Sequence, residues 1–319
     1  MNPKQNKVTT LTLNPSIDQI QTVDPFQPFG KNKILSSEKF FGGKGINAAF
    51  TLGKLGADCI ALGFAGSDTF SAYEDKLKKV RVEADLIAIE GKTRENLKIV
   101  DLSSGKDTEF NQPGFQVGVQ DLALLNSMVE KHLPDTDWLI LCGSLPPGVP
   151  TNFYYVMISL AKSKGTRTCL DTSGLPLLEG ISARPDILRI NLSEFRELIH
   201  ASLEDEKELV REIVHFQKTA VDTLVISLGS QGAIGFDGRD MLKLKIPAIS
   251  PVSLTGAGDA MTAAFVHQLN QNKSFKDALL YSAAVASASV LCKEPGDFHL
   301  KDVNWHLANI QMEELNSVM

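Results

Sequence analysis

The fold is decided by the stretch Leu254-Thr255-Gly256-Ala257-Gly258-Asp259-Ala260, in which two glycines and an acid stand before an apolar, helix-forming run, Ala260 to Leu269. Glycines let a backbone approach a ligand closely, and the first amides of a helix favour negative charge. This stretch therefore predicts an anion-binding loop whose aspartate acts as a general base. The alternative is an ordinary turn followed by an aspartate that caps the helix.

Composition narrows the class of protein. The chain has 319 residues, 43% of them hydrophobic, which is enough to bury the core of one large α/β domain or of two smaller ones. The formal net charge is −6, and no stretch is rich in lysine and arginine. These features argue against nucleic acid or an anionic membrane surface as the main partner. A bound phosphate must then be held by local groups.

The cysteines and the N-terminus predict a cytoplasmic protein. Cys59, Cys142, Cys169 and Cys292 are far apart and form no C-x-x-C pair, so we expect reduced thiols in the core. The first residues, Met1 to Lys7, are polar and lack the apolar core of a signal peptide. No apolar run reaches the length needed to span a bilayer.

The first strand is expected from Val8 to Asn14, where Asn14-Pro15-Ser16 breaks it. Asp18 lies just past this end. Ligands of open α/β sheets bind outside the carboxyl ends of the strands, so Asp18 is a candidate for binding substrate hydroxyls. A turn acid that caps its own backbone is the alternative.

Two stretches, Gln19 to Phe40 and Leu86 to Phe110, read as short strands that project from the core. Together they could form one small sheet that acts as a lid. Apolar residues on such a sheet need cover, so a homodimer formed through the lids is an expectation. Under this division the core comprises residues 1–16, 41–85 and 115–319, and the lid comprises residues 17–40 and 86–114.

A second glycine-rich stretch, Phe41-Gly42-Gly43-Lys44-Gly45-Ile46-Asn47, precedes an expected helix, Ala48 to Leu55, and a strand, Cys59 to Gly66. Its glycines would let a sugar press against the backbone, while Lys44 and Asn47 hold the sugar oxygens. The stretch lacks the G-x-x-x-x-G-K-[ST] pattern of a Walker-type nucleotide loop. A glycine-rich helix entry without a ligand is the alternative.

Arg94, in Thr93-Arg94-Glu95-Asn96, is the lid's strongest candidate for gripping a phosphate on the substrate. Its guanidinium presents a planar fork of donors that suits phosphate oxygens. The alternative is a solvated arginine on an edge strand.

The remaining chain alternates strands and helices, which is typical of a parallel, doubly wound sheet. Small or polar residues follow several expected strands, and their accumulation at one edge favours a ligand site there. These strand ends lie at Asn14, Gly143, Asp171, Asn191 and Gly229.

Asn191 and Glu194 supply hard oxygen atoms of the kind that Mg2+ prefers. The alternative is a helix start with a glutamate in its first turn. None of the six histidines has a partner at metal-ligand spacing, and the sequence contains no evident Ser/His/Asp arrangement.

These motifs together resemble those of the PfkB, or ribokinase-like, carbohydrate kinases, and the resemblance spans nearly the whole chain. The opening L-N-P-S-I-D with G-G-K-G-I-N is most similar to the branch that holds 1-phosphofructokinase and tagatose-6-phosphate kinase. The resemblance implies a ribokinase-like, doubly wound, mostly parallel sheet flanked by helices, with a small β-sheet lid. It rests on residues 14–18, 42–47, 93–96, 143–148, 191–194, 227–233 and 255–260.

The resemblance also implies roles for individual residues. Asp259 would be the general base, and the amides of Gly256, Ala257 and Gly258 would form the anion hole. Arg94, with Asn96, would hold the phosphate already on the substrate. Residues implied in binding the sugar are Asp18, Gly42, Gly43, Lys44, Asn47 and Ser144. ATP and Mg2+ are the implied cofactors. Glu194 and Asn191 would bind the metal ion, partly through water. Residues implied in binding ATP are Asn191, Ser227, Gly229, Gly232, Thr255, Gly258 and Ser287.

The resulting hypothesis is ATP-dependent phosphorylation of a ketohexose monophosphate, with fructose 1-phosphate giving fructose 1,6-bisphosphate. Tagatose 6-phosphate is the alternative substrate. A non-catalytic sensor of sugar phosphates or nucleotides, built on the same fold, is the alternative of another class. Arg189-Ile190-Asn191 stands where the family often has Lys-Pro-Asn, so a lysine contact to ATP is not assumed.

Overall fold

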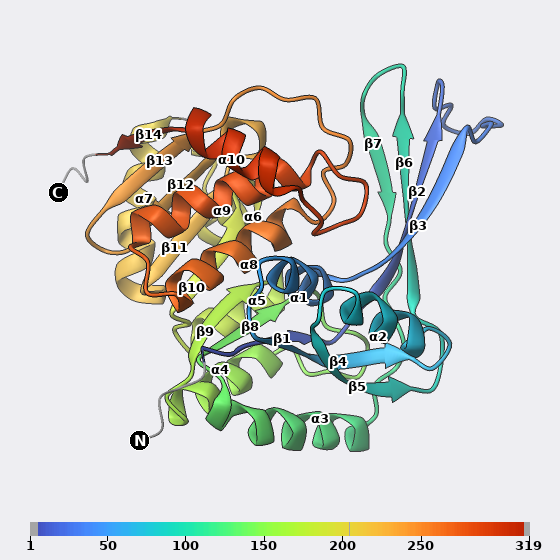
Figure 1. Cartoon of the computed structure of the whole chain (residues 1–319), viewed down its shortest axis with the longest axis horizontal. Helices are drawn as coiled ribbons and strands as arrows, with labels where there is room; N and C mark the ends of the chain where they lie inside the picture. Colours follow the sequence, from blue (N-terminus) through green and yellow to red (C-terminus); the bar gives the residue numbers. More distant parts are fainter. Residues whose placement is uncertain (1–5, 204, 316–319) are drawn as a thin grey trace.

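The computed structural model describes residues 6–203 and 205–315 and contains two β-sheets (Figure 1). The large sheet has ten strands in the order β14-β13-β12-β11-β10-β9-β8-β1-β4-β5. The small sheet has four strands in the order β3-β2-β6-β7 and stands away from the large one.

The large sheet is parallel from β5 through β11 and antiparallel at the other edge, from β11 to β14. This arrangement confirms the prediction of a mostly parallel, doubly wound sheet. Its strands are β1 (Val8–Thr12), β4 (Cys59–Gly66), β5 (Glu83–Ile89), β8 (Trp138–Cys142), β9 (Arg167–Asp171), β10 (Ile187–Asn191), β11 (Thr223–Ser227), β12 (Ala233–Phe236), β13 (Met241–Lys245) and β14 (Gln311–Glu314).

The parallel part of the sheet packs against a hydrophobic core on each face, which explains why strands such as β8 are apolar throughout. In β8, Trp138 and Ile140 belong to one hydrophobic core, and Leu139 and Leu141 belong to the other. Because side chains alternate between the faces of a strand, a run without polar residues fills both cores at once.

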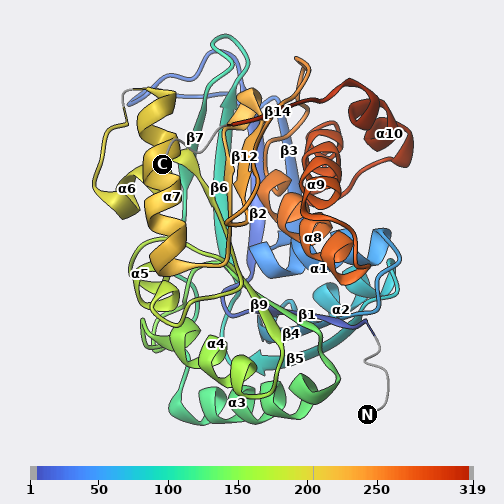
Figure 2. The same cartoon turned by 90° about the vertical axis from the view of Figure 1, so that its left-hand side faces the viewer.

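Helices cover the two faces in separate layers (Figures 1 and 2). One layer holds α1 (Lys44–Lys54), α2 (Phe70–Lys78), α8 (Ala257–Asn270) and α9 (Phe275–Ser289), with α10 (Leu300–Asn309) packed outside α9. The other layer holds α3 (Val119–His132), α4 (Phe153–Ser163), α5 (Leu175–Ile181), α6 (Leu192–Ile199) and α7 (Glu206–Ala220). Short 3-10 turns are η1 (Leu133–Asp135) and η2 (Gly229–Gln231).

No helix within the described residues combines the length and the apolar character needed to cross a membrane.

The small sheet comprises the segments predicted to act as a lid, and we refer to it as the lid. Its strands are β2 (Ser16–Val23), β3 (Ser36–Gly42), β6 (Arg94–Asp101) and β7 (Asp107–Phe110). Its boundaries differ from the predicted ones. Residues 86–89, expected in the lid, belong to β5 of the large sheet, whereas Ser16 and residues 41–42, expected in the core, belong to lid strands. The chain bends at residues 13–14, between β1 and β2, and at residues 90–91, between β5 and β6, and these bends mark where it passes from one sheet to the other.

The register of the parallel strands brings the predicted site residues to one edge. Thr12, Cys142 and Asp171 are neighbours across β1, β8 and β9. Asn191 and Ser227 are neighbours at the ends of β10 and β11. The lid rises from this same edge, because β2 follows directly after β1.

Candidate active site

Helix α8 begins at Ala257, three residues before the predicted start at Ala260. Gly256 is its N-cap, with a φ of 83°, a conformation that glycine adopts without strain. Asp259 therefore lies inside the first turn, and the interpretation of Asp259 as the N-cap is wrong. The first amides of a helix lack intrahelical acceptors, so this turn is suited to an anion.

The carboxylate of Asp259 is buried, with 7% of the residue exposed. Its Oδ2 accepts a hydrogen bond of 2.9 Å from Nδ2 of Asn47 on α1. Burial, reinforced by the nearby charge of Asp171, raises the pKa of Asp259 to about 6, although Lys44 opposes the shift. At neutral pH the group is mostly ionised and close to the pH at which it can take up a proton.

Asp171, at the end of β9, organises the cations around the site, and it was identified from the sequence only as a strand end. Its Oδ1 accepts 2.7 Å from Nζ of Lys44. Its Oδ2 accepts from Nη1 of Arg189 at 3.4 Å and from the hydroxyl of Thr262 at 2.8 Å. Burial alone would raise the pKa of Asp171, but Lys44 and Arg189 outweigh it and lower the pKa. Asp171 thus stays ionised and fixes both cations.

Arg189 packs flat against Gly258. A Cβ on Gly258 would lie 2.5 Å from Nη1 of Arg189, so any larger residue at this position would displace the guanidinium. Nη2 of Arg189 donates 2.9 Å to Oγ of Ser227. Its Nε is buried and has no hydrogen-bond partner among the described residues, which leaves a donor for a ligand oxygen.

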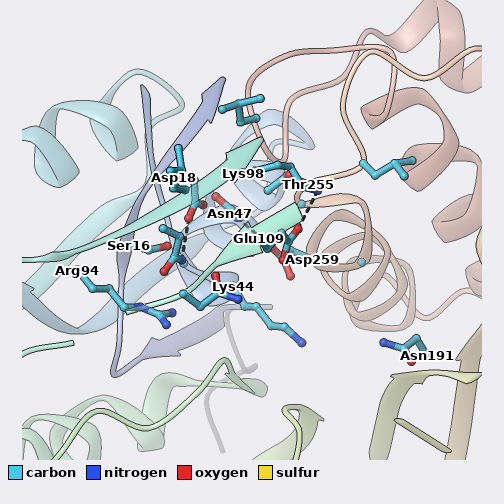
Figure 3. A pocket seen from close by; sticks show the side chains of 18 of the residues that line it. Ser16, Asp18, Lys44, Asn47, Arg94, Lys98, Glu109, Asn191, Thr255 and Asp259 are labelled. Carbon is cyan, nitrogen blue, oxygen red and sulfur yellow. Dashed lines mark hydrogen bonds and ion pairs between the residues drawn. The ribbon is translucent and has the colours of Figure 1, made fainter. Parts of the chain in front are cut away.

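A first cavity, of about 470 Å3, opens between the lid and this edge of the core (Figure 3). In Figure 3, Arg94 lies at one end of the row of side chains and Asn191 at the other, with Lys44, Asn47 and Asp259 between them. Predicted site residues that line it are Asp18, Gly43, Lys44, Asn47, Arg94, Asn96, Asn191, Glu194, Thr255, Gly256, Gly258 and Asp259.

Asp18 and Asn47 form the part of this cavity suited to hydroxyl groups. Oδ1 of Asp18 accepts 3.0 Å from Nδ2 of Asn96 on the neighbouring lid strand. Oδ1 of Asn47 is buried and has no partner in the described part of the chain, so it can accept from a ligand hydroxyl. Gly42 lies directly beneath Asp18, where a Cβ would come within 2.6 Å of Oδ2.

Ser144 and Gly42 are not among the residues that line the first cavity. Oγ of Ser144 accepts 3.1 Å from Nδ2 of Asn14, so it contacts the strand end beneath the lid. Gly42 acts through Asp18, against which it packs.

Arg94 is anchored by backbone carbonyls. It donates to the carbonyl oxygens of Pro15 at 3.3 Å, Asn14 at 3.0 Å and Gln112 at 3.3 Å. The alternative of a solvated edge arginine is wrong, because the side chain is half-buried and burial lowers the pKa of its guanidinium. Its remaining N–H groups can face the cavity that it lines.

A second cavity, of about 680 Å3, lies beyond Arg189 and Gly258, which line both cavities. Its walls are largely apolar and include Ile246, Ile249 and Met261. Of the residues predicted to bind ATP or to form the anion hole, those that line it are Ser227, Gly229, Gly232, Ala257, Gly258 and Ser287. Asn191 and Thr255 line the first cavity instead.

Asn191 and Glu194 form a capping box at the start of α6. Glu194 Oε2 accepts 2.8 Å from the amide of Asn191, and Asn191 Oδ1 accepts 2.8 Å from the amide of Glu194. The alternative interpretation, a helix start with Glu194 in its first turn, therefore describes this segment correctly. Both residues also line the first cavity. Within the described residues, no group of three or more His, Cys, Asp or Glu side chains could hold a metal ion.

Lys98 and Glu109, from β6 and β7, also line the first cavity and were not predicted as site residues. Lys98 could have been predicted from the sequence, because side chains alternate along a strand and Lys98 therefore lies on the same face of β6 as Arg94 and Asn96. Glu109 carries no comparable signal, because the pairing of β7 with β6 is needed to place it.

Comparisons with known proteins point to one family. A model of the pfkB family of carbohydrate kinases matches residues 11–301. The 1-phosphofructokinase of Borreliella burgdorferi is 31% identical over 97% of this chain and 99% of its own. A tagatose-6-phosphate kinase of Staphylococcus epidermidis is 31% identical over 85% of this chain and 89% of its own.

Among solved structures, phosphofructokinase-2 from Escherichia coli in complex with potassium superimposes with a TM-score of 0.85. It is 27% identical in sequence, and the match covers 95% of this chain and 98% of that one. This likeness confirms the expected fold class. From the span of the family match and the identity of these relatives, the chain belongs to the pfkB family of carbohydrate kinases.

Proposed function

We propose that this kinase transfers the γ-phosphoryl group of ATP to a ketohexose monophosphate, with fructose 1-phosphate giving fructose 1,6-bisphosphate. The observation that carries the proposal is the position of Asp259. Its buried carboxylate stands in the first turn of α8, where a polar cavity and an apolar cavity meet at Gly258. An acceptor and a donor bound in these two cavities would meet beside the one carboxylate.

Asp259 would act as the general base. As the sugar hydroxyl attacks the γ-phosphorus, its O–H bond breaks and the proton passes to the carboxylate of Asp259, while the bond from the γ-phosphorus to the β,γ-bridging oxygen breaks and ADP leaves with that oxygen. Asn47 holds that carboxylate through its amide donor at 2.9 Å, and Oδ1 of Asn47, which has no partner among the described residues, can accept from a neighbouring hydroxyl. A pKa of about 6 keeps the base ionised at neutral pH.

Lys44 and Arg189 would stabilise the charge that develops on the transferring oxygens. Both are held by the same buried carboxylate, Asp171, at 2.7 Å and 3.4 Å. Cations fixed before the reaction need no reorganisation during it, which makes them effective in stabilising a transition state. The amides of the first turn of α8 would contribute in the same way.

ATP fits the second cavity. Its volume of about 680 Å3 lies in the range of nucleotide and drug-sized sites. The unpartnered Nε of Arg189, at the boundary of both cavities, is a donor for a phosphate oxygen. Mg2+, when bound with ATP, would neutralise phosphate charge. Glu194 and Asn191 would hold the metal ion, partly through water. Mg2+ commonly binds to one or two carboxylates and to the phosphates of the substrate.

The substrate would lie in the first cavity, with its hydroxyls on Asp18 and Asn47 and its phosphate on the lid near Arg94. Tagatose 6-phosphate is the second candidate substrate. The relative that is named a tagatose-6-phosphate kinase has the same identity, 31%, as the first 1-phosphofructokinase relative. Both sugars present one phosphate and several hydroxyls to this cavity.

A homodimer through the lids remains part of the proposal, in a cytoplasmic protein. Ile34, Leu35, Leu102 and Phe110 are on or next to lid strands and are each at least 50% exposed. Burying such side chains against a second lid would remove apolar surface from water.

A coupled assay with ATP and Mg2+ tests the activity against fructose 1-phosphate, fructose 6-phosphate, tagatose 6-phosphate and the free sugars. We expect the highest kcat/KM with fructose 1-phosphate. Faster turnover of tagatose 6-phosphate would transfer the assignment to the second candidate. Turnover of free sugars alone, or of none of these compounds, would refute the proposal.

A further inference from the structure

The inner face of the lid carries a second cation besides Arg94. Arg94, Asn96 and Lys98 alternate along β6 and all line the first cavity. Positions two apart on a strand are about 6.6 Å apart, so Arg94 and Lys98 flank Asn96 at equal distances. Asn96 holds Asp18, which is where the sugar hydroxyls are expected. A phosphate on that sugar could therefore reach either cation.

Lys98 is held by two carboxylates on β7. Its Nζ lies 2.8 Å from Oδ2 of Asp107 and 2.8 Å from Oε1 of Glu109. Its side chain is 16% exposed, whereas those of Asp107 and Glu109 are 43% and 51% exposed. Burial opposes the charge on Lys98, but the hydrogen bonds that its ammonium donates to Asp107 and Glu109 outweigh burial and raise the pKa of Lys98. Lys98 is thus a largely buried, charged group whose two partners are about half exposed.

The two carboxylates differ in position. Glu109 lines the first cavity together with Lys98, while Asp107 is not among its lining residues. Glu109 is also directly opposite Lys98 in the register of β6 and β7. An anion that approaches Lys98 from the cavity therefore meets Glu109 first.

Arg94 and Lys98 differ in how their donors are occupied. Arg94 donates to three backbone carbonyls, at Asn14, Pro15 and Gln112, which are fixed by the fold. A half-exposed glutamate can instead swing into water at small cost. Of the two lid cations that line the first cavity, Lys98 is the one whose partner can be exchanged for a ligand.

We propose that Lys98 is a specificity-determining residue, on whose ammonium the phosphate of the incoming sugar replaces Glu109. This inference rests on the proposed function and deepens it. Two carboxylates share one ammonium, so the cluster is negative overall and resists weak anions. A phosphate dianion forms stronger charge-assisted hydrogen bonds than a single carboxylate, whereas a hydroxyl group does not. Glu109 thereby selects phosphorylated over free sugars by competing with the ligand.

Opposite effects of two substitutions test this proposal. Lys98→Met removes the phosphate contact and should raise the Kd for fructose 1-phosphate by about tenfold or more, the size expected for a lost hydrogen bond to a charged group. Glu109→Gln keeps the shape but removes the competing charge, and should lower that Kd by about threefold. Asp107→Asn is the matched control, since it takes one charge from the same ammonium outside the cavity; it should change the Kd less than Glu109→Gln does.

The Kd is measured by titration calorimetry on the full chain without ATP, and the KM and kcat in the coupled assay. Thermal unfolding of each variant checks the fold. A structural role alone would lower the Tm in both variants and would not tighten binding in either. An unchanged Kd in Lys98→Met, or weaker binding in Glu109→Gln, overturns the proposal; if Lys98→Met does not fold, Glu109→Gln decides it.

Wild-type turnover separates this inference from the proposed function. If the wild type phosphorylates a sugar phosphate and the variants have the same Kd and KM for it, only the role proposed for Lys98 is refuted. Where wild type acts on free sugars alone, the proposed function itself is wrong, and Lys98 has no phosphate to bind.

Discussion

The two cavities that meet at Gly258 differ in what their walls offer. The first is lined by charged side chains such as Asp18, Lys44 and Glu109. The second is lined mainly by apolar and small residues, including Ile246 and Ala283. On this basis we expect a ligand of the first cavity to be recognised by charges with fixed directions, and a ligand of the second by shape and backbone groups. Substitutions in the first cavity should therefore have the larger effects.

The difference follows from how each wall is built. Strand ends and the inner face of the lid supply the first cavity, and both present side chains at fixed intervals. The second is bounded by the irregular segment 246–251 and by α9, whose small residues include Ala283, Ala286 and Ser287. Small side chains there leave room for a flat ligand without offering many directed contacts.

Replacing the residue where the cavities meet should have the largest effect. Asp259→Asn removes the base and should lower kcat at least ~100-fold, the size expected for losing general-base catalysis. The KM values for the sugar phosphate and ATP should change little, because the amide keeps the shape and can still accept from Asn47. The measurement is steady-state kinetics with each substrate varied in turn; near-normal turnover would remove Asp259 from the mechanism.

The pH profile of wild type is the control for this assignment. Burial raises the pKa of Asp259 from 3.8 to about 6, so the protonated, inactive form accumulates below that pH. We expect kcat/KM to fall as the pH drops through about 6 and to be level above it. Asp259→Asn should lose this dependence on pH, whereas a profile that stays sloped in the variant would point to another titrating group.

Arg189 lines both cavities, so we expect its substitution to affect both substrates rather than one of them. Arg189→Met should lower kcat/KM for the sugar phosphate and for ATP alike, by about 30-fold, because a contact to a charged group is lost and Asp171 loses one of its cations. Arg189→Lys keeps the charge and should recover most of the loss. A Met variant affected with only one of the two substrates would contradict the shared position.

Asp18 lines the first cavity and not the second, so we expect its substitution to affect the sugar phosphate and not ATP. Asp18→Asn weakens acceptance of sugar hydroxyls, so the KM for the sugar phosphate should rise by about tenfold. The KM for ATP should stay within about twofold, because Asp18 does not line the second cavity. Kinetics with ATP saturating and then limiting measure both values; equal changes in the two would indicate general disruption of the site.

Ser287 belongs to the second cavity alone and should show the smallest effect. Ser287→Ala removes one neutral hydroxyl from α9, so the KM for ATP should rise by about threefold at most. The KM for the sugar phosphate should not change. A larger loss with ATP would mean that the second cavity depends on directed contacts more than its apolar walls suggest.

Much of the fold and of the site could be predicted from local patterns. The apolar runs gave the parallel strands, and residues after the strand ends, such as Asn191, were expected at one edge of the sheet. The apolar run from Ala260 predicted helix α8, whereas the helix begins at Ala257 although glycine has low helix propensity. That propensity is outweighed at a helix start, where Gly256 caps the helix and Gly258 leaves room for the guanidinium of Arg189.

What the sequence determined by itself is the set of elements and the chemistry available at each strand end, because both depend on residues near one another in the chain. The tertiary structure alone decided which groups meet. Asp171 lies 127 residues from Lys44, and Asp259 lies 212 residues from Asn47, yet each pair is hydrogen-bonded. Likewise, Glu109 reaches Lys98 only through the pairing of β7 with β6. Such contacts follow from strand order and register, which depend on packing of the whole sheet rather than on any local run of residues.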